Sequence, residues 1–429
     1  MNPNRYIGVL TAFASLAATS PASGHPQGSR LLFTPTESAL RLVKTSPADP
    51  GSWVTDAGKD KLIKDGISFI DITNIKDEEV IAMLSTPERH LSHTYLDQST
   101  YLAQPQMEWT HENTGAQFMA SPEHTTTFNA EIAMHHLKIM TEYLGRKRHD
   151  LGSNSDLERR FWTRDHRSVN GTRAARWLFE TIEKIAGANP RIEVTQFLHN
   201  ATYQPSVIAK LPGRTSDIVV FGAHFDSTAG EPNSRAPGAD DNASGTVVLL
   251  ELLRNIAERT RQNGMKPWTQ PRNTVEFHFY AAEEAGLLGS SEIFHEYKKR
   301  NKSVVAMLNH DMLGFSSTGK ITLGGDNIDP RLTHVLRSIA KQHHIETLSF
   351  SCGYACSDHA SARNNGFPAA FITADRRATA NKRIHTGRDT LETIQEDTLA
   401  RHFKFGLAAL GVLSGANVTA LGRPSDEPR

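Results

Sequence analysis

The stretch I-V-V-F-G-A-H-F-D-S, residues 218–227, decides the fold class of this chain. Its first four residues are apolar and rich in β-branched and aromatic side chains, which is typical of a short buried strand. His224 and Asp226 follow within five residues of that run. A buried strand that ends in polar, chemically capable side chains indicates a sheet with a site at its edge.

Further apolar runs alternate with segments of helical periodicity along the chain. Apolar runs occupy residues 275–280, 304–308 and 369–373, and helices are predicted over 246–261, 290–299, 331–342 and 397–413. Alternation of this kind predicts a mostly parallel sheet covered on both faces. The expected fold is therefore a three-layer α/β/α sandwich, within a catalytic domain of residues 113–416.

Polar side chains follow three of these runs, where each predicted strand ends. They are His224 and Asp226, Glu283 and Glu284, and Asp311. In open α/β sheets, ligands bind beyond the carboxyl ends of the strands. These side chains are therefore expected to meet at one edge of the sheet.

The residue types at this edge suit two divalent cations. The candidate ligands are His224, Asp240, Glu284, Asp311 and His385. Imidazole and carboxylate groups are typical zinc ligands, and three ligand charges against four positive ones leave a Lewis-acidic centre. Water held between such ions loses a proton near neutral pH, and Glu283 is placed to accept it and pass it to a leaving amine.

Each signal has an ordinary structural explanation when taken alone. Any one of 20 histidines is more often a surface or core residue, and Asp240-Asp241 in a Gly-rich stretch is typical of a solvated turn. Glu283-Glu284 is also typical of a helix start. Cys352 and Cys356 favour a local disulfide in an oxidising compartment, and a zinc pair is the alternative.

Six stretches, in order, make the chain resemble the M28 family of metallo-aminopeptidases, especially secreted fungal and bacterial leucyl aminopeptidases. They are G-A-H-F-D-S (222–227), P-G-A-D-D-N-A-S-G (237–245), A-A-E-E-A-G-L-L-G-S (281–290), H-D-M (310–312), C-G-Y-A-C-S-D-H-A-S (352–361) and I-H-T (384–386). The resemblance covers residues 120–413 and implies a zinc-peptidase-like fold.

The resemblance implies a role for each matching metal-site residue. Asp240 would bridge both ions, with Glu284 and His385 completing one site and His224 and Asp311 the other. Glu283 would be the general acid/base, and Asp226 would orient His224. The family's cis peptide would follow the bridging residue, which places it before Asp241.

The same resemblance implies a substrate pocket beside the metals. Cys352 and Cys356 would form the family's disulfide and present Tyr354, while Met312 and Ile384 would wall the apolar pocket. Departures from the family pattern include Thr373, Arg377 and Ala380 near the pocket, and His310 and Leu313 beside Asp311. Thr373, Arg377 and Ala380 favour a specificity broader than leucine. For His310 and Leu313, neutral sequence drift is as good an explanation as altered specificity.

The ends of the chain indicate secretion as a precursor. Residues 1–24 have the charged, apolar and small-residue layout of a signal peptide, residues 25–112 are interpreted as a propeptide, and residues 417–429 form a polar tail. Sequons at Asn170, Asn200, Asn301 and Asn417 are compatible with an extracellular glycoprotein. Lys plus Arg and Asp plus Glu are 47 each, which implies no nucleic-acid or membrane partner.

The predicted function is removal of amino-terminal residues, apolar and leucine-like, from peptides with a free amino terminus. The attack would come from a hydroxide bridging two divalent ions, with zinc the expected metal, in a secreted monomer without a membrane anchor. A glutaminyl cyclase or carboxypeptidase on the same scaffold and a non-catalytic interaction ectodomain are the alternatives. The chain lacks the G-x-S-x-G elbow of serine hydrolases and the H-E-x-x-H helix of zincins.

Overall fold

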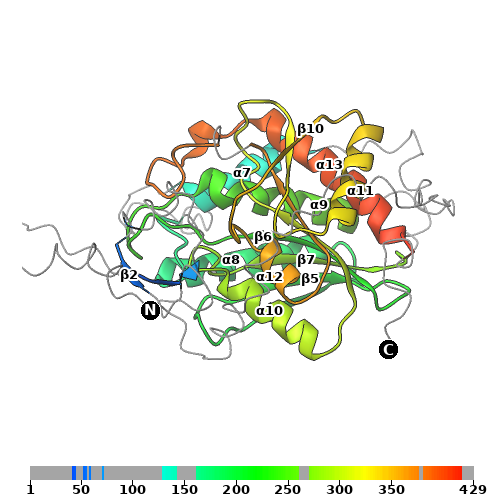
Figure 1. Ribbon diagram of the computed structural model, residues 1–429, viewed down its shortest axis with the longest axis horizontal. Coiled ribbons are helices and arrows are strands. Elements are labelled where there is room, and N and C mark those ends of the chain that lie inside the picture. Colours follow the sequence, from blue (N-terminus) through cyan, green and yellow to red (C-terminus); the bar gives the residue numbers. More distant parts are fainter. Residues whose placement is uncertain are drawn as a thin grey trace, which may run out of the picture. The chain divides into compact units, whose positions relative to one another are not determined.

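An eight-stranded mixed sheet forms the centre of the catalytic region (Figure 1). The computed structural model describes residues 41–44, 52–55, 58, 70–71, 128–142, 161–259, 270–375 and 380–417. The strands are β4 Glu193–Phe197, β5 Ser206–Leu211, β6 Ile218–His224, β7 Thr274–Tyr280, β8 Val304–His310, β9 Ile321–Gly324, β10 Thr347–Phe350 and β11 Ala369–Thr373. Their order in the sheet is β10-β9-β11-β8-β6-β7-β5-β4.

The middle of this sheet is parallel and its flanks are not. β7, β6, β8 and β11 run parallel to one another, whereas β5 and β4 are antiparallel additions on one side. On the other side β9 pairs antiparallel with β11 and parallel with β10. Parallel neighbours end at the same edge, so the carboxyl ends of β7, β6 and β8 lie next to each other.

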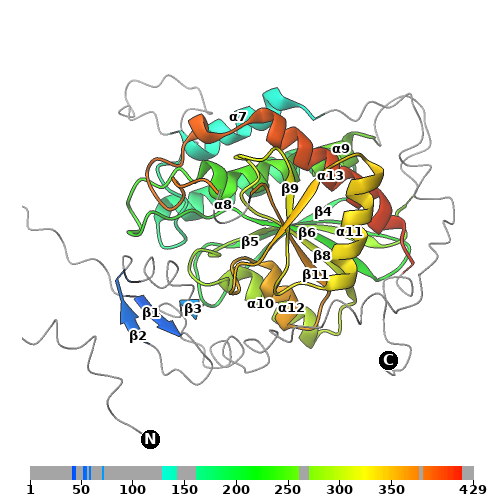
Figure 2. The same cartoon turned by 45° about the horizontal axis from the view of Figure 1, so that its top comes forward.

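Helices cover both faces of the sheet (Figure 2). One layer contains α7, α8, α9, α11 and α13, and the other contains α10 and α12. Their bounds are α7 Ala130–Thr141, α8 Val169–Ala186, α9 Gly245–Arg259, α10 Leu288–Lys299, α11 Pro330–Gln342, α12 His359–Asn364 and α13 Glu396–Gly415. The predicted three-layer α/β/α architecture is confirmed.

Alternation along β6 explains how one strand serves both layers. Val219, Phe221 and Ala223 face the larger core, whereas Ile218 and Val220 face the smaller one. All seven residues of β6 are buried. Full burial of a Val, Ile or Phe side chain contributes roughly 1.5–3 kcal/mol. The strand that ends in His224 is therefore held from both sides.

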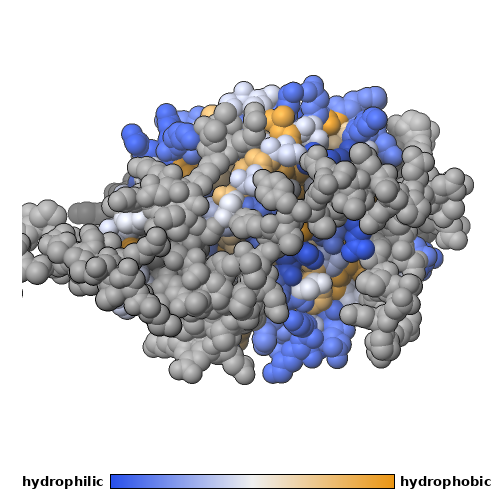
Figure 3. All heavy atoms as spheres, in the orientation of Figure 1, coloured by the Kyte–Doolittle hydropathy of each residue, from blue (hydrophilic) through white to orange (hydrophobic). Residues whose placement is uncertain are grey.

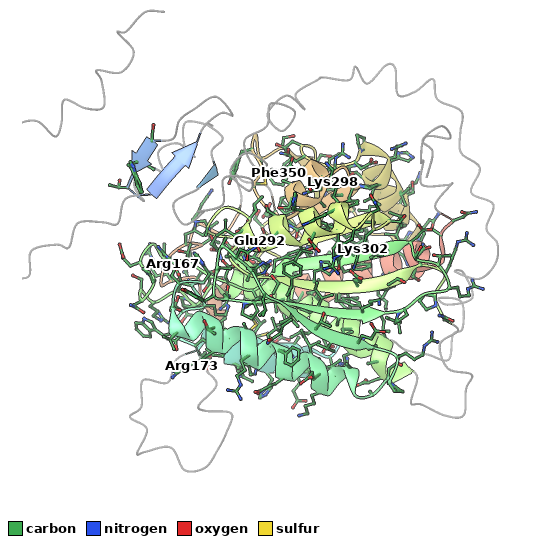
Figure 4. The ribbon with its side chains drawn as sticks, turned by 90° about the horizontal axis from the view of Figure 1, so that it is seen from below. Arg167, Arg173, Glu292, Lys298, Lys302 and Phe350 are labelled. Atoms are coloured by element: carbon green, nitrogen blue, oxygen red, sulfur yellow. A yellow bond between two sulfur atoms is a disulfide. The ribbon has the colours of Figure 1, made fainter. Side chains whose placement is uncertain are left out.

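The outer sides of the helices carry polar residues, as expected for a molecule with two internal cores. Figure 3 shows hydrophilic side chains over α10, where Lys298 and Lys299 are exposed. Figure 4 shows Arg173 on the outer side of α8 and Glu292 on α10. Glu292 is buried and accepts from the backbone N–H groups of Asn200 and Ala201, so it anchors the loop before β5.

Most predicted elements are confirmed, and four short strands were missed. The 369–373 run coincides with β11, and the other predicted strands and helices overlap β6, β7, β8, α9, α10, α11 and α13. The missed strands are β4, β5, β9 and β10. β4 lies at an edge and leaves most of its side chains partly or fully exposed, so it lacks the apolar signature of a buried strand.

The predicted precursor segments are only sparsely described. Within residues 25–112, a three-stranded antiparallel sheet is formed by β1 Arg41–Lys44, β2 Ser52–Val54 and β3 Ile70–Asp71. The predicted signal peptide, the rest of that region and residues 418–429 lie outside the described residues. No helix among the described residues is both long enough and apolar enough to cross a membrane.

Candidate metal centre

Side chains from three adjacent strand ends and two loops meet at one edge of the sheet. His224 is the last residue of β6, Asp311 follows β8 directly, and Glu284 lies in the turn after β7. Asp241 comes from the π-helical turn η3, Ala239–Ser244, which precedes α9. His385 comes from the loop before the short helix η4, Leu391–Thr393. The predicted convergence of these strand ends is confirmed.

These side chains form two groups of metal-ligating atoms with one shared member. In the first group His224 Nε2 lies 3.2 Å from Asp241 Oδ1 and 3.4 Å from Asp311 Oδ1. In the second, His385 Nε2 lies 3.0 Å from Asp241 Oδ2 and 3.1 Å from Glu284 Oε2. Asp241 thus presents a different carboxylate oxygen to each group.

The shared residue is Asp241, so the prediction that Asp240 bridges two ions is wrong. Asp240 Oδ1 instead accepts from the backbone N–H groups of Gly314 (2.8 Å) and Phe315 (3.1 Å). Neighbouring side chains on a non-helical backbone point in different directions, and Asp241 has non-helical φ and ψ of −111° and 95°. Only one of the two aspartates can therefore face the histidines.

The cis peptide is displaced by the same single residue. It joins Asp241 to Asn242, whereas the prediction placed it before Asp241. It thus still follows the residue shared by both groups. Asn242 Oδ1 accepts from the backbone N–H groups of Gly245 and Met312, and its Nδ2 donates to the His310 carbonyl. These contacts tie η3 to the end of β8.

The chemistry of the donor set fits divalent cations. His224 Nε2, Asp311 Oδ1 and Glu284 Oε1 are buried and have no hydrogen-bond partner. Buried polar atoms without partners are costly, and a cation coordinated by them would remove that cost. Burial also raises the pKa of Glu284, against the opposing effect of His385. Imidazole nitrogens with carboxylate oxygens form a donor set typical of zinc.

Glu283 stands beside the two groups but belongs to neither. Its Oε2 lies 3.9 Å from His224 Nε2, and its side chain is 11% exposed. Burial raises the pKa of Glu283 well above its usual value; His224 opposes this, while Asp358 adds to it. A carboxylate with raised proton affinity at this position is suited to accepting and returning a proton.

Asp226 contacts three residues of the site. Its Oδ1 lies 3.4 Å from His224 Nδ1 and accepts from the Glu283 N–H at 3.0 Å. Its other oxygen accepts from the Glu284 N–H at 3.2 Å. One buried carboxylate therefore links the end of β6 to the turn after β7.

Two supporting residues were not identified from the sequence. Asp389 accepts from the backbone N–H groups of Asp240 and Asp241, and Ser357 Oγ donates to Asp311 Oδ2 at 2.7 Å. Asp389 lies four residues after His385, and Ser357 follows the second cysteine of a recognised stretch. The only local sequence feature that points to Asp389 is its position four residues after His385. A single aspartate in a polar loop is too common for that position to predict a role.

The predicted Cys352–Cys356 disulfide is present, with the two Cα atoms 6.2 Å apart. Asp326 holds this loop by accepting from the backbone N–H groups of Cys352 (3.0 Å) and Gly353 (2.6 Å). The zinc-pair alternative for these cysteines is thereby excluded. Tyr354 lies within the loop and is partly buried.

The residues that depart from the family pattern fall into two classes. His310 and Leu313 are buried, and burial lowers the pKa of His310 to about 4, so both act as core residues. Thr373 is buried at the end of β11 and lies near the Met312 carbonyl, at 3.4 Å. Arg377 lies outside the described residues.

Comparisons with known proteins show what this chain is similar to. Residues 206–410 match the family model described as Peptidase family M28. Leucine aminopeptidase 1 of Arthroderma otae is 36% identical over 381 residues, covering 85% of this chain and 89% of that protein. The crystal structure of the LapA aminopeptidase of Legionella pneumophila has a TM-score of 0.62 at 20% identity, covering 90% of this chain and 95% of that one.

A glutaminyl cyclase shares the fold as well. The crystal structure of the cyclase from Bacteroides thetaiotaomicron has a TM-score of 0.51 at 17% identity, covering 66% of this chain and 97% of that one. At such identities the likeness concerns the fold alone. Function has to be argued from the site residues.

Proposed function

Since this chain belongs to peptidase family M28, we propose that it is a secreted aminopeptidase that uses two divalent metal ions, with zinc the expected metal. The observation that carries the proposal is the arrangement of Asp241, whose two oxygens face two separate groups, each completed by one histidine and one further carboxylate. The 36% identity to a leucine aminopeptidase over most of both chains supports the choice of reaction.

The proposed ligands divide into two sets around Asp241. His224 and Asp311 would hold one ion, and Glu284 and His385 the other, as the contacts of 3.0–3.4 Å with the histidines suggest. Two such ions, when bound, polarise a peptide carbonyl and lower the pKa of water. Three ligand carboxylates leave this pair with a net positive charge, which suits a nucleophilic attack on an amide.

The protein's own residues would transfer the proton of the attacking water and position the metal ligands. Glu283 would accept the proton of the attacking water at a carboxylate oxygen and deliver it to the nitrogen of the leaving amine. Asp226 would fix the position of the His224 ring relative to Glu283 and Glu284, because its carboxylate contacts that ring and both backbone N–H groups. The burial of the ligands, of which only His385 is well exposed at 43%, limits competition from bulk water.

Substrate recognition would come from residues beside the metals. Tyr354 in the disulfide loop, with Met312 and Ile384, would form the wall against the first side chain of the peptide. Thr373 and Ala380 would leave that pocket larger than a strict leucine pocket. We therefore propose release of apolar residues with tolerance of others.

One experiment tests the reaction and separates it from the alternatives. The purified protein, trimmed of residues 1–112, is assayed against peptide libraries varied at the amino-terminal and the carboxy-terminal residue, with elemental analysis of the same sample. The expected result is amino-terminal release and two ions per chain. Cyclisation of amino-terminal glutamine, carboxy-terminal release or no turnover would each contradict the proposal and favour one of the alternatives.

A further inference from the structure

Arg164 is a charged side chain buried completely beside the metal centre. All four of its guanidinium hydrogen bonds go to backbone carbonyls: Nε donates to Phe225 at 2.6 Å, Nη1 to Met140 at 2.8 Å and Pro237 at 2.5 Å, and Nη2 to Gly238 at 2.9 Å. Among the described residues, no carboxylate forms a salt bridge with it. Its partners therefore define a role in holding backbone rather than in ion pairing.

Three of those carbonyls belong to the two segments that carry the proposed ligands, and the fourth, of Met140, belongs to α7. Phe225 lies between His224 and Asp226, and Pro237 and Gly238 lead directly into η3, which carries Asp241. The planar guanidinium thus joins the end of β6 to the entry of η3. Arg167, labelled in Figure 4, lies three residues further along the chain, just before α8.

The backbone around Arg164 contacts the same loop independently. Ala236 donates its N–H to the Trp162 carbonyl at 3.0 Å, and Thr163 forms a parallel bridge with Ala236. The Arg164 N–H donates to Ser227 Oγ at 3.1 Å, and that hydroxyl donates to the Ala236 carbonyl at 2.7 Å. Residues 162–164 therefore run alongside residues 236–238 and are hydrogen-bonded to them.

The packing at Gly238 leaves little room for another arrangement. Gly238 has a φ of +50°, and a Cβ there would lie 2.4 Å from the Asp241 carbonyl oxygen, 2.6 Å from Ser227 Cβ and 2.9 Å from Arg164 Nη2. Glycine permits this close approach of backbone to the guanidinium. The loop is thus shaped to bring its carbonyls to Arg164.

We infer that Arg164 is a positioning residue for the metal centre: its guanidinium sets the position of the Asp241 turn relative to His224, and thereby the affinity for both ions. The inference rests on the proposed two-ion site. Because Asp241 belongs to both groups, a shift of its turn weakens both ions together rather than one. Lysine cannot replace the fork, because an ammonium group cannot reach four carbonyls in this planar arrangement.

Zinc titration of metal-free protein, in competition with a chelator, tests this inference. We expect both dissociation constants to rise about 10- to 100-fold in Arg164→Met, the usual scale for residues that support metal ligands. Arg164→Lys should show a similar rise despite its charge. The matched control is Tyr297→Phe, which removes a buried hydrogen bond to Glu276 in the core on the other face of the sheet and should leave both constants unchanged.

The outcomes separate this inference from the proposed function. Failure of the unsubstituted protein to bind two ions overturns the proposed function. Two ions in the unsubstituted protein with unchanged constants in Arg164→Met, or restored constants in Arg164→Lys, overturns the role of Arg164 alone. If Arg164→Met does not fold, Arg164→Lys decides, because it keeps the positive charge and removes the planar fork that reaches the Phe225, Pro237 and Gly238 carbonyls: we expect a rise in both constants, and no change contradicts the inference.

Discussion

At the scale of single residues, two adjacent aspartates have opposite tasks. Asp241→Asn should lower metal content sharply, because one carboxylate serves both groups. Asp240→Asn should keep both ions and cost little stability, because the amide oxygen of asparagine can still accept from the Gly314 and Phe315 N–H groups. Elemental analysis and chemical denaturation of both variants check this. Loss of metal in Asp240→Asn with normal loading in Asp241→Asn would instead identify Asp240 as the residue shared by both ions.

The two adjacent glutamates also differ in task. Glu283→Gln should keep both ions and bind peptide yet lose turnover by about 100-fold or more, the usual scale for loss of a general acid/base. Glu284→Gln should instead weaken metal loading, since its carboxylate lies 3.1 Å from His385. If Glu283 only favoured the start of a helix, the amide would cost about 1 kcal/mol of stability and little rate. Near-normal turnover in Glu283→Gln would refute the proposed proton transfer.

At the scale of elements, the disulfide loop is expected to control substrate binding. Asp326→Ala removes the acceptor for the Cys352 and Gly353 N–H groups, so the loop that carries Tyr354 should shift and KM should rise about 3- to 10-fold with kcat less affected. Asp329→Ala is the matched control, because Asp329 accepts from the Arg331 and Leu332 N–H groups at the start of α11. It should cost about 1 kcal/mol of stability and leave KM unchanged. Equal KM values in the two variants would exclude a role for the loop.

At the scale of the whole molecule, the region before residue 113 is expected to inhibit the catalytic domain. A covalently attached segment competes at an effective concentration of about a millimolar, so even weak contact with the site would reduce peptide binding. Protein beginning near residue 25 should therefore have a lower kcat/KM than protein beginning near residue 113. The comparison requires equal metal content in both preparations. Equal kcat/KM values would show that this region is not an inhibitory propeptide.

Much of this architecture follows from local sequence, because burial of a strand on both faces needs an uninterrupted apolar run. Residues 218–221, 275–280 and 304–308 carry that signal, and their parallel pairing brings His224, Glu284 and Asp311 to one edge. The edge strand β4 carries no such signal, since all of its residues are partly or fully exposed. It takes its place only by pairing with a strand that is already positioned.

The sequence by itself determined the fold class, the disulfide and four of the five residues placed around the two groups, because each of these depends on residue type and position along a strand or loop. The tertiary structure alone decided between Asp240 and Asp241, because both are aspartates in one turn and only the path of the backbone decides which faces the histidines. It also assigned Arg164 and Asp389. Both act through backbone groups distant in the sequence, and no local pattern encodes such contacts.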